Sequence, residues 1–408
     1  MKILQLCKKF PFPVKDGESI AVSYLAKALN EQGAEVTLLA MNTHKHWVDT
    51  DHLPEGMEHY RAVKAVDVDN RIKPIGAFVN LFTDNSYHIE RFIDQQFTNK
   101  LVEQLQRERF DVVQLETLYL APYISFIRKH SNAIIVLRSH NVEHEIWERV
   151  ALNSTPLKRW YLEHITPKLK RYEIQALNNY DLMVGITQRD VDQFKLLGLN
   201  KPSVVCPIGL DSRDYQPDYD SYRRPLSLSF IGSLDWMPNL EGLQWFLENV
   251  WTPLLQPRFP KLTLHIAGRN TPSWLLRQNL PGVTVHGEVE SARAFINQHS
   301  AMVVPLLSGS GMRAKILEGM ALGKVVISSR VGMEGITIEN RCEALLADQP
   351  QDYVDAVQWC YDRQKTLEQT GRLARNCFEK NFDNFESAGH LLEAYRELKE
   401  VRSLKFKV

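Results

Sequence analysis

The stretch PLLSGSGMRAKILEGMALGKVVISS (305–329) decides the fold of this chain. An apolar run leads into the glycine-rich segment 308–311, and a helical pattern then extends from about Met312 to Leu322. Gly323 stands where a helix C-terminus favours glycine, and a second apolar run follows it. A strand, a turn, a helix and a strand in this order form the repeating unit of a doubly wound α/β domain.

The same alternation of short apolar runs and amphipathic stretches extends over the whole chain. Nearly continuous hydrophobicity is typical of parallel strands that are covered on both faces. Residues 211–225 are polar, contain proline and have no helical period, so they separate a first set of strands from a second. The predicted strands are residues 2–6, 35–40, 111–116, 133–139, 182–187 and 203–209 in the first set, and 226–233, 262–268, 283–289, 301–307, 325–329 and 343–347 in the second.

Two doubly wound α/β domains of similar size follow from this pattern, as the length of 408 residues also suggests. Ligands of such sheets bind beyond the carboxyl ends of the strands, so the loops after the strands are the candidate sites. The predicted boundaries are residues 1–210 for the first domain, 211–225 for a linker, 226–380 for the second domain, and 381–408 for an amphipathic helix that crosses back to the first.

Composition narrows the class of protein. Lys+Arg and Asp+Glu are equal at 49 each, so no overall charge attracts nucleic acid or an anionic membrane. The five cysteines are scattered without a C-x-x-C motif, which favours a reducing compartment. The apolar run at the N-terminus is shorter than a signal peptide needs, and no apolar run in the sequence is nearly as long as a transmembrane helix. We therefore expect a cytoplasmic protein.

The glycine-rich turn at 308–311 has the features of an anion site. Backbone N–H groups and the positive end of the helix dipole meet at such a helix start. Arg313 and Lys315 lie in the predicted first turn, where positive charge is locally unfavourable by about 0.3–1 kcal/mol, which indicates a bound anion such as a diphosphate. Glu318 either pairs with Lys315 or accepts hydrogen bonds from ligand hydroxyls. The alternative is an ordinary loop with a surface salt bridge.

The stretch GSGMRAKILEGMALGKVV (309–326) resembles the donor site of GT-B fold glycosyltransferases in the large retaining family known as family 4. Its pattern G-x-G-x-R-x-K-x-L-E is similar to that of bacterial exopolysaccharide-type sugar transferases. The resemblance covers nearly the whole chain, because further blocks follow in the expected order. These blocks are residues 8–29, 137–147, 207–211, 230–246, 265–270 and 285–289.

The resemblance implies two Rossmann-like domains facing each other across a cleft. It implies transfer of a sugar, with retention, from a nucleotide diphosphate sugar (UDP-sugars among them) to a hydroxyl of a glycan or lipid-linked glycan, in bacterial polysaccharide or glycoconjugate synthesis. No cofactor and no metal are expected. The implied donor-binding residues are Gly17, Gly232, Ser233, Gly309, Ser310, Gly311, Arg313, Lys315 and Glu318, and the implied catalytic residues are His140, Arg313 and Lys315.

The chain also departs from the family pattern. Glu318 matches the second of two family glutamates, which holds the donor ribose, but Ser310 stands in place of the first. The usual Arg and Lys after the first strand of the second domain are absent, and Asn239 stands near the expected Lys. We expect Arg313 and Lys315 to bind the diphosphate instead.

The letters LRSHNVEHEIW (137–147) contain H-x-x-E-H, a zinc peptidase motif. A zinc site would need His140 and His144 on one helical face, yet the preceding apolar run places His140 at a strand end and the helix begins near Glu143. Two interpretations are left: His140 and Asn141 bond the loop backbone, or His140 contacts the transferred sugar or orients the acceptor.

Two D-x-D triplets and one basic segment have weaker functional interpretations. Residues 67–69, after a weak strand, and 218–220 mimic a metal-binding pair but are expected to be solvated acids. Residues 157–173 combine basic and aromatic side chains, which suits either a membrane surface or, as we prefer, a solvated helix face with its aromatics in the core. Peripheral contact with the inner face of the cytoplasmic membrane therefore stays open.

Other functions fit the sequence less well. A nicotinamide-dependent oxidoreductase would need G-x-G-x-x-G after the first strand, where this chain has CKKFP (7–11). A sugar-nucleotide epimerase has the same architecture, and a non-catalytic relative would keep the fold without turnover. Release of free nucleoside diphosphate distinguishes a transferase from both.

Overall fold

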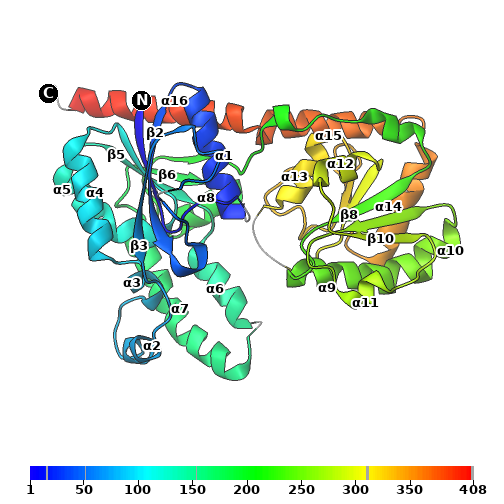
Figure 1. Ribbon diagram of the computed structural model, residues 1–408, viewed down its shortest axis with the longest axis horizontal. Coiled ribbons are helices and arrows are strands. Elements are labelled where there is room, and N and C mark those ends of the chain that lie inside the picture. Colours follow the sequence, from blue (N-terminus) through cyan, green and yellow to red (C-terminus); the bar gives the residue numbers. More distant parts are fainter. Residues whose placement is uncertain (15–16, 51, 153, 309–311, 406–408) are drawn as a thin grey trace. The chain divides into compact units, whose positions relative to one another are not determined.

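The computed structural model describes residues 1–14, 17–50, 52–152, 154–308 and 312–405 (Figure 1). It divides the chain into two compact units. The first unit comprises residues 1–208 together with the C-terminal helix from Asn384, and the second comprises residues 209–383. Each unit is built on one parallel sheet, as predicted, and each is described below by itself.

The first unit contains a parallel sheet in the strand order β3-β2-β1-β4-β5-β6-β7. Its strands are β1 (Lys2–Cys7), β2 (Glu35–Thr43), β3 (Tyr60–Val68), β4 (Val112–Leu115), β5 (Ile134–Ser139), β6 (Leu182–Gly185) and β7 (Ser203–Val205). Its helices are α1 (Gly17–Glu31), α2 (Pro74–Asn80), α3 (Tyr87–Glu90), α4 (Gln95–Arg107), α5 (Ile124–His130), α6 (Glu143–Leu152), α7 (Pro156–Ala176), α8 (Gln188–Leu196) and α16 (Asn384–Lys405).

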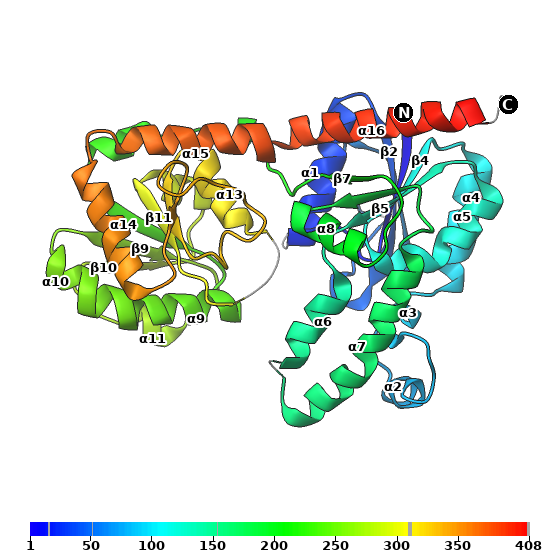
Figure 2. The same ribbon diagram turned by 180° about the vertical axis from the view of Figure 1, so that it is seen from behind.

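Alternate residues of the central strands feed two separate hydrophobic cores. Leu4 and Leu6 of β1 join one core with Phe97 of α4, whereas Ile3 joins the other core with Leu25 of α1. Successive side chains of a strand point to opposite faces, so a sheet covered on both faces needs apolar residues throughout. Figures 1 and 2 show α4 and α5 together on one side of this sheet and α1 on the other.

Helix α16 completes the second of these cores. Leu391 and Leu392 are buried there, and the hydroxyl of Tyr395 donates to Gln114 Oε1 of β4 at 2.7 Å. Helix α16 crosses α1 and contacts it, as both views of the chain show (Figures 1 and 2). The last helix of the chain is thus an integral part of the first unit.

The second unit contains a parallel sheet in the order β10-β9-β8-β11-β12-β13. Its strands are β8 (Ser227–Ile231), β9 (Thr263–Ala267), β10 (Val283–Gly287), β11 (Ala301–Val304), β12 (Val325–Ser328) and β13 (Leu345–Leu346). Its helices are α9 (Met237–Phe246), α10 (Gln256–Arg258), α11 (Ser273–Leu276), α12 (Ala292–Asn297), α13 (Ala314–Ala321), α14 (Pro350–Asp362) and α15 (Leu367–Phe382), and a π-helical segment (Leu247–Leu255) joins α9 to α10.

Two features differ from the sequence-based expectation. Strand β3 is nine residues long, whereas the sequence indicated only a weak strand before Asp67. It lies at the sheet edge, where polar residues interrupt the apolar pattern. Residues 211–225, expected as a linker, pack into the second unit: Tyr215 and Tyr222 are buried, and Lys324 Nζ donates to the carbonyl of Asp218 at 2.6 Å.

Candidate functional site

Several of the predicted donor residues lie beyond the carboxyl ends of β8 and β11 in the second unit. These two strands are neighbours, and the order of the sheet reverses between them, with β9 on one side and β12 on the other. Such a switch point in a doubly wound sheet is where the loops after the strands diverge and leave room for a ligand. Helix α13 starts beside it, after the glycine-rich segment.

Lys315, in the first turn of α13, reaches across to the loop after β8. Its ammonium donates to Asn239 Oδ1 at 2.7 Å, and Asn239 Nδ2 donates to the carbonyl of Ser233 at 2.9 Å. A Cβ atom at Gly232 would lie only 2.6 Å from Lys315 Nζ. The missing side chain of Gly232 therefore allows the cation to lie against the end of β8.

Burial shifts the ionisation of this lysine. Removal from water, and then the charge of Arg313, lower the pKa of Lys315 from its usual 10.5 to about 7, although Glu318 acts in the opposite direction. Desolvation disfavours the charged form of an amine. A bound anion would restore that charge, so the site favours a ligand that brings negative charge to Lys315.

Arg313 precedes α13 and is its N-cap residue, so it lies just outside the first turn in which the sequence placed it. Its guanidinium lies 3.9 Å from the carboxylate of Glu334, and only 11% of the side chain is exposed. Arg313 and Lys315 thus bring two cations to the start of one helix. The helix dipole and both charges favour an anion there.

Glu318 lies one turn after Lys315 in α13. The two side chains have different hydrogen-bond partners. The hydroxyl of Tyr215 donates to Glu318 Oε1 at 3.1 Å. Burial raises the pKa of Glu318, while the hydrogen bond from Tyr215 and the charge of Arg293 act to lower it. The sequence left two alternatives for Glu318, an ion pair with Lys315 or hydrogen bonds to a ligand. In the structure Lys315 bonds to Asn239 and Glu318 to Tyr215, which favours the second alternative.

The remaining predicted donor residues lie in three places. The hydroxyl of Ser233 donates to Asp235 Oδ1 at 2.5 Å on the surface, and the carbonyl of Ser233 accepts from Asn239, the partner of Lys315. Gly17 belongs to the first unit, where it is the first residue of α1 and faces open space. Gly309, Ser310 and Gly311 lie outside the described residues.

His140 lies at the carboxyl end of β5 in the first unit, above a buried carboxylate. Its Nε2 is 3.0 Å from Glu116 Oε2, and Arg138 Nη1 is 3.1 Å from the same oxygen. The other oxygen of Glu116 accepts hydrogen bonds from the side-chain amides of Gln5 and Gln114. All four of these side chains contact this one carboxylate.

This cluster defines the protonation of His140. Burial alone would raise the pKa of Glu116, but Arg138 and the hydrogen bond from His140 outweigh it and lower the value to about 2. The ionised carboxylate only accepts, so Nε2 of His140 carries the proton and Nδ1 carries the lone pair. Burial lowers the pKa of His140, which keeps the ring neutral at neutral pH. His140 thus offers an acceptor nitrogen and no charge.

The H-x-x-E-H letters form no zinc geometry. His144 Nδ1 lies 2.5 Å from Glu173 of α7, whereas His140 turns to Glu116, so the two rings have different partners. Glu173 also accepts the backbone N–H of Glu143 at 2.9 Å and so caps the start of α6. In the described part of the chain, no group of three or more His, Cys, Asp or Glu side chains is placed to hold a metal ion.

Both D-x-D triplets have structural partners. Asp67 accepts from Asn42 Nδ2 at 2.9 Å within the edge of the first sheet, and Asp69 pairs with Arg71 at 2.8 Å. Asp218 caps a 3-10 turn, and Asp220 pairs with Arg223. These contacts make the triplets part of the local structure rather than only solvated acids.

Sequence reasoning missed the partners of the site residues. The residues of the cluster below His140 are polar residues inside or at the end of otherwise apolar strands: Gln5, Gln114, Glu116 and Arg138. Their polarity among apolar neighbours was the sequence signal that could have identified them. Tyr215 was not predicted as a site residue because its segment was expected to be a linker. The roles of these residues depend on neighbours far away along the chain.

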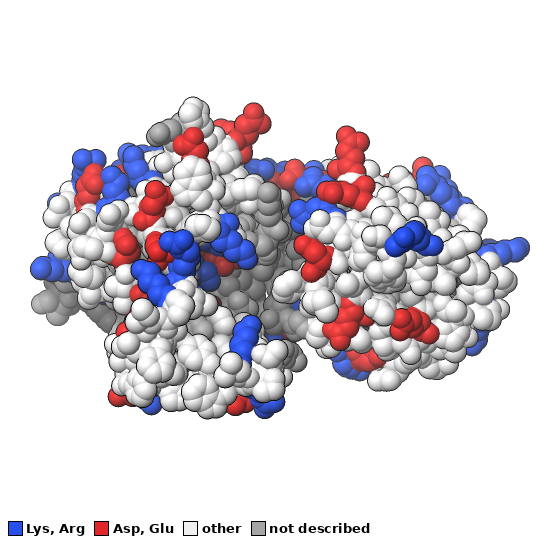
Figure 3. Space-filling view, turned by 60° about the horizontal axis from the view of Figure 1, so that its bottom comes forward, with Lys and Arg blue, Asp and Glu red and all other residues white. Residues whose placement is uncertain are grey.

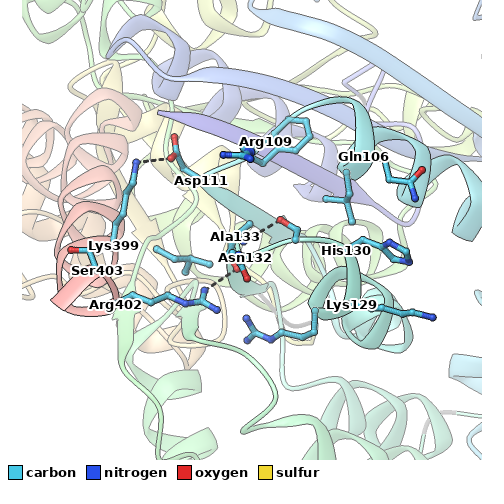
Figure 4. Close-up of a pocket in the computed structure, with 15 residues that line it drawn as sticks. Gln106, Arg109, Asp111, Lys129, His130, Asn132, Ala133, Lys399, Arg402 and Ser403 are labelled. Carbon is cyan, nitrogen blue, oxygen red and sulfur yellow. Dashed lines mark hydrogen bonds and ion pairs between the residues drawn. The ribbon is translucent and has the colours of Figure 1, made fainter. Parts of the chain in front are cut away.

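A separate pocket in the first unit lies at the opposite edge of its sheet (Figure 4). The segments that precede β4 and β5 line it together with α16. Lys399 of α16 pairs with Asp111 at 2.6 Å, and Arg402 of α16 donates to the carbonyl of Ala133 at 3.0 Å. His140 is at the carboxyl end of β5 and Ala133 precedes its amino end, so this pocket is not part of the candidate site.

Comparison with known proteins gives a family match within the second unit and a fold match over nearly the whole chain. Residues 225–363, which contain β8, β11 and α13, match the family model described as "Glycosyl transferases group 1". The chain is 22% identical to an "Uncharacterized 44.6 kDa protein in cps region" of Klebsiella pneumoniae, over 97% of this chain and 99% of that protein.

Solved structures share the fold at lower identity. Sucrose-phosphate synthase from Thermosynechococcus elongatus superposes with a TM-score of 0.69 at 17% identity, over 98% of this chain and all of that one. HepE of Anabaena, solved in complex with UDP, gives 0.67 at 14% identity, over 97% of this chain and all of that one. This protein therefore has the GT-B fold, and its residues 225–363 are similar to the group 1 glycosyltransferases.

Proposed function

We propose that the protein is a retaining glycosyltransferase that moves a sugar from a nucleotide diphosphate sugar to a hydroxyl of a glycan or lipid-linked glycan. The observation that carries this proposal is the partly buried ammonium of Lys315, which lies against Gly232 at the switch point between β8 and β11. That point lies inside the domain that matches the glycosyltransferase family. Structural relatives were solved with UDP and with UDP-glucose, which supports a nucleotide-sugar donor.

The proposed chemistry breaks the bond between the anomeric carbon and the phosphate. Negative charge develops on the leaving nucleoside diphosphate, and stabilising it is the main catalytic demand. Arg313 and Lys315 bring positive charge to this position without a metal ion. Glu318 would hold the ribose through its hydroxyls. The Klebsiella relative comes from a cps region, which supports a role in polysaccharide synthesis.

The first unit would serve the transferred sugar and the acceptor. His140 presents a neutral ring with an acceptor nitrogen, which suits a hydrogen bond from a sugar or acceptor hydroxyl. With retention, the leaving phosphate itself takes the acceptor proton, so His140 is proposed to orient a hydroxyl rather than to remove its proton.

Thermal melting against a ligand panel tests the donor site: UDP, GDP, ADP and CMP, UDP- and GDP-sugars, NAD⁺, and zinc with and without chelator. A ligand at 100 times its Kd stabilises by about 2.7 kcal/mol. We expect a shift with one nucleoside diphosphate that is lost in Arg313→Ala and Lys315→Met. A shift with zinc alone, reversed by chelator, would contradict the proposal.

Turnover then needs a separate measurement, because binding does not distinguish a transferase from an epimerase or a non-catalytic relative. We expect free nucleoside diphosphate to accumulate only when a hydroxyl acceptor is added to the donor. Conversion of the donor sugar without release of nucleoside diphosphate would identify an epimerase.

A further inference from the structure

Glu143, the first residue of α6, is a buried acid beyond the carboxyl end of β5, with 7% of its surface exposed. The hydroxyl of Tyr119 donates to Glu143 Oε2 at 2.9 Å, and Trp147 Nε1 in turn donates to the Tyr119 hydroxyl at 3.2 Å. Among the described residues, no group donates to Oε1 of Glu143 and no Lys or Arg pairs with its carboxylate. A buried carboxylate oxygen without a donor is costly, so a donor from outside the chain is expected there.

The start of a helix favours an acid, but this preference does not explain Glu143. Glu145 lies in the same first turn of α6, is less buried, and pairs with Arg189 and Arg149. The backbone N–H of Glu143 is accepted by Glu173 Oε1 at 2.9 Å, so another side chain already caps this helix. The helix dipole and the cap therefore account for Glu145 and Glu173, and they leave the burial of the Glu143 carboxylate unexplained.

His140 offers a second hydrogen-bond acceptor three residues earlier. Its Nε2 proton is directed to Glu116, so Nδ1 carries the lone pair. Within the residues that the structure describes, no donor reaches Nδ1, and 7% of the side chain is exposed. His140 follows β5 directly and Glu143 begins α6, so both acceptor atoms belong to the end of the same strand.

Charges after β1 and at the start of α1 surround both residues. Lys8 Nζ lies 3.4 Å from the carboxylate of Glu18 and 4.5 Å from the centre of the Tyr119 ring. Burial dominates the pKa of both His140 and Glu143, and the charge of Glu18 acts on both as well. The two side chains therefore lie within electrostatic reach of one and the same carboxylate.

The environment of Glu143 also sets its ionisation. Burial raises the pKa of Glu143 to about 7, and Glu173 and Glu18 add to this increase, whereas Lys8 and the hydrogen bond from Tyr119 oppose it. The carboxyl group is therefore close to half ionised at neutral pH. A ligand that donates a hydrogen bond to Oε1 favours the ionised form.

Two acceptor atoms without donors suit a neutral ligand that carries several hydroxyls. A diol of a sugar ring brings two O–H donors and no charge. Lys8 disfavours a cation here, and the carboxylates of Glu18 and Glu143 disfavour an anion. Figure 3, which turns the side of α6 and α7 toward the reader, shows Lys and Arg intermixed with Asp and Glu on the first unit. This surface therefore has no field of one sign that would select a charged ligand.

We propose that Glu143 is a second acceptor-binding residue beside His140, and that its Oε1 accepts a hydrogen bond from a hydroxyl of the acceptor glycan. The two residues would hold two hydroxyls of one sugar ring. The identity of this sugar as the acceptor rests on the proposed function. Binding of a sugar at Glu143 needs neither donor nor turnover, so it can be measured by itself.

Saturation-transfer NMR of the full-length protein with octyl glycosides tests the proposal. The probes are octyl glucoside, galactoside, mannoside and N-acetylglucosaminide below their micelle concentrations, since each presents a sugar ring on a lipid-like chain. The variants are Glu143→Gln and Tyr119→Phe. Glu145→Gln is the matched control, because Glu145 is an acid of the same helical turn whose partners are Arg189 and Arg149. The melting temperature of each variant checks its fold.

We expect a glycoside to bind the wild type and Glu145→Gln equally, and Glu143→Gln at least about tenfold more weakly. Wild-type affinity should fall as pH drops from about 8 to about 6, because the carboxylate becomes protonated, whereas Glu143→Gln should show no such change. Against burial, the Tyr119 hydroxyl lowers the pKa of Glu143, so in Tyr119→Phe the loss of affinity should begin at a higher pH. A merely structural role of Glu143 would not move this pH profile.

Absence of glycoside binding by the wild type, or equal binding by the wild type and Glu143→Gln, would overturn the proposal. The transferase proposal fails separately, if a glycoside binds through Glu143 but no nucleoside diphosphate is released when donor is added. Conversely, glycoside-dependent release with the same KM for the glycoside in wild type and Glu143→Gln would support the transferase and reject the role of Glu143.

Discussion

The ammonium of Lys315 lies 2.7 Å from Asn239 Oδ1, so the first turn of α13 is bound to the first turn of α9, the helix that follows β8. The sequence resemblance leads one to expect a lysine near position 239. This chain has Asn239 there, and Asn239 instead accepts a hydrogen bond from Lys315 of α13. Positive charge at the candidate donor site therefore comes from α13, across the switch point of the sheet.

The pH dependence of donor binding should report this lysine. The pKa of Lys315 is lowered to about 7, first by burial and then by Arg313, and a diphosphate binds the protonated form more tightly. We expect the affinity for nucleoside diphosphate to fall as pH rises from about 6 to about 9. Calorimetry on Lys315→Arg should show a nearly flat profile, because guanidinium stays charged. An identical slope in both proteins would assign the titration to another group.

Gly232→Ala should weaken donor binding without unfolding the protein. The new Cβ would lie 2.6 Å from Lys315 Nζ and 2.9 Å from Asn239 Nδ2, both of them ends of side chains that can move. We expect a loss of roughly tenfold in nucleotide affinity and a stability change within about 1 kcal/mol. Gly76→Ala is the matched control, because its Cβ would meet nothing closer than 3.5 Å. Unchanged affinity in Gly232→Ala would show that Lys315 does not touch the ligand.

Glu318 and Tyr215 should affect nucleotides but not inorganic pyrophosphate. The carboxylate is proposed to bind ribose hydroxyls, and the Tyr215 hydroxyl positions it at 3.1 Å. We expect Glu318→Gln to weaken the binding of UDP, or of the nucleoside diphosphate that binds in its place, about tenfold. Tyr215→Phe should weaken this binding less, by the contribution of one hydrogen bond. Competition by pyrophosphate should be the same in wild type and both variants. A parallel loss for pyrophosphate would place Glu318 near the phosphates instead.

Glu116 should stabilise the first unit in a pH-dependent way. Despite burial, Arg138 and His140 lower the pKa of Glu116 from 4.5 to about 2. The unfolded chain therefore binds more protons between these values, so the contribution of Glu116 is complete above pH 4.5 and is lost as pH falls toward 2. The shift corresponds to about 3 kcal/mol.

Comparison of wild type with Glu116→Gln isolates this contribution. The variant leaves the Arg138 charge buried beside a neutral amide, and we expect it to be less stable by about 3 kcal/mol at pH 7. Denaturant unfolding at several pH values should show the difference shrinking below pH 4.5. A difference that does not change with pH would mean that Glu116 is not ionised in the folded protein.

Much of the architecture could be predicted from the sequence. The buried strands of both sheets have nearly continuous apolar residues, so their positions follow from local pattern. The glycine that ends α13 at position 323 follows from backbone preference, since Gly323 has a φ of +63°. Strand β3 was underestimated because an edge strand needs few apolar residues, and residues 211–225 were misread because their buried tyrosines stand among polar neighbours.

The sequence by itself determined the fold class, because buried strands and turns leave signals within a few residues. Only the tertiary structure decided which side chains meet. Lys315 and Asn239 are separated by 76 residues, and Glu116 and His140 by 24. These contacts arise because parallel strands that are distant along the chain become neighbours in a sheet, and no local periodicity records which loops are brought together.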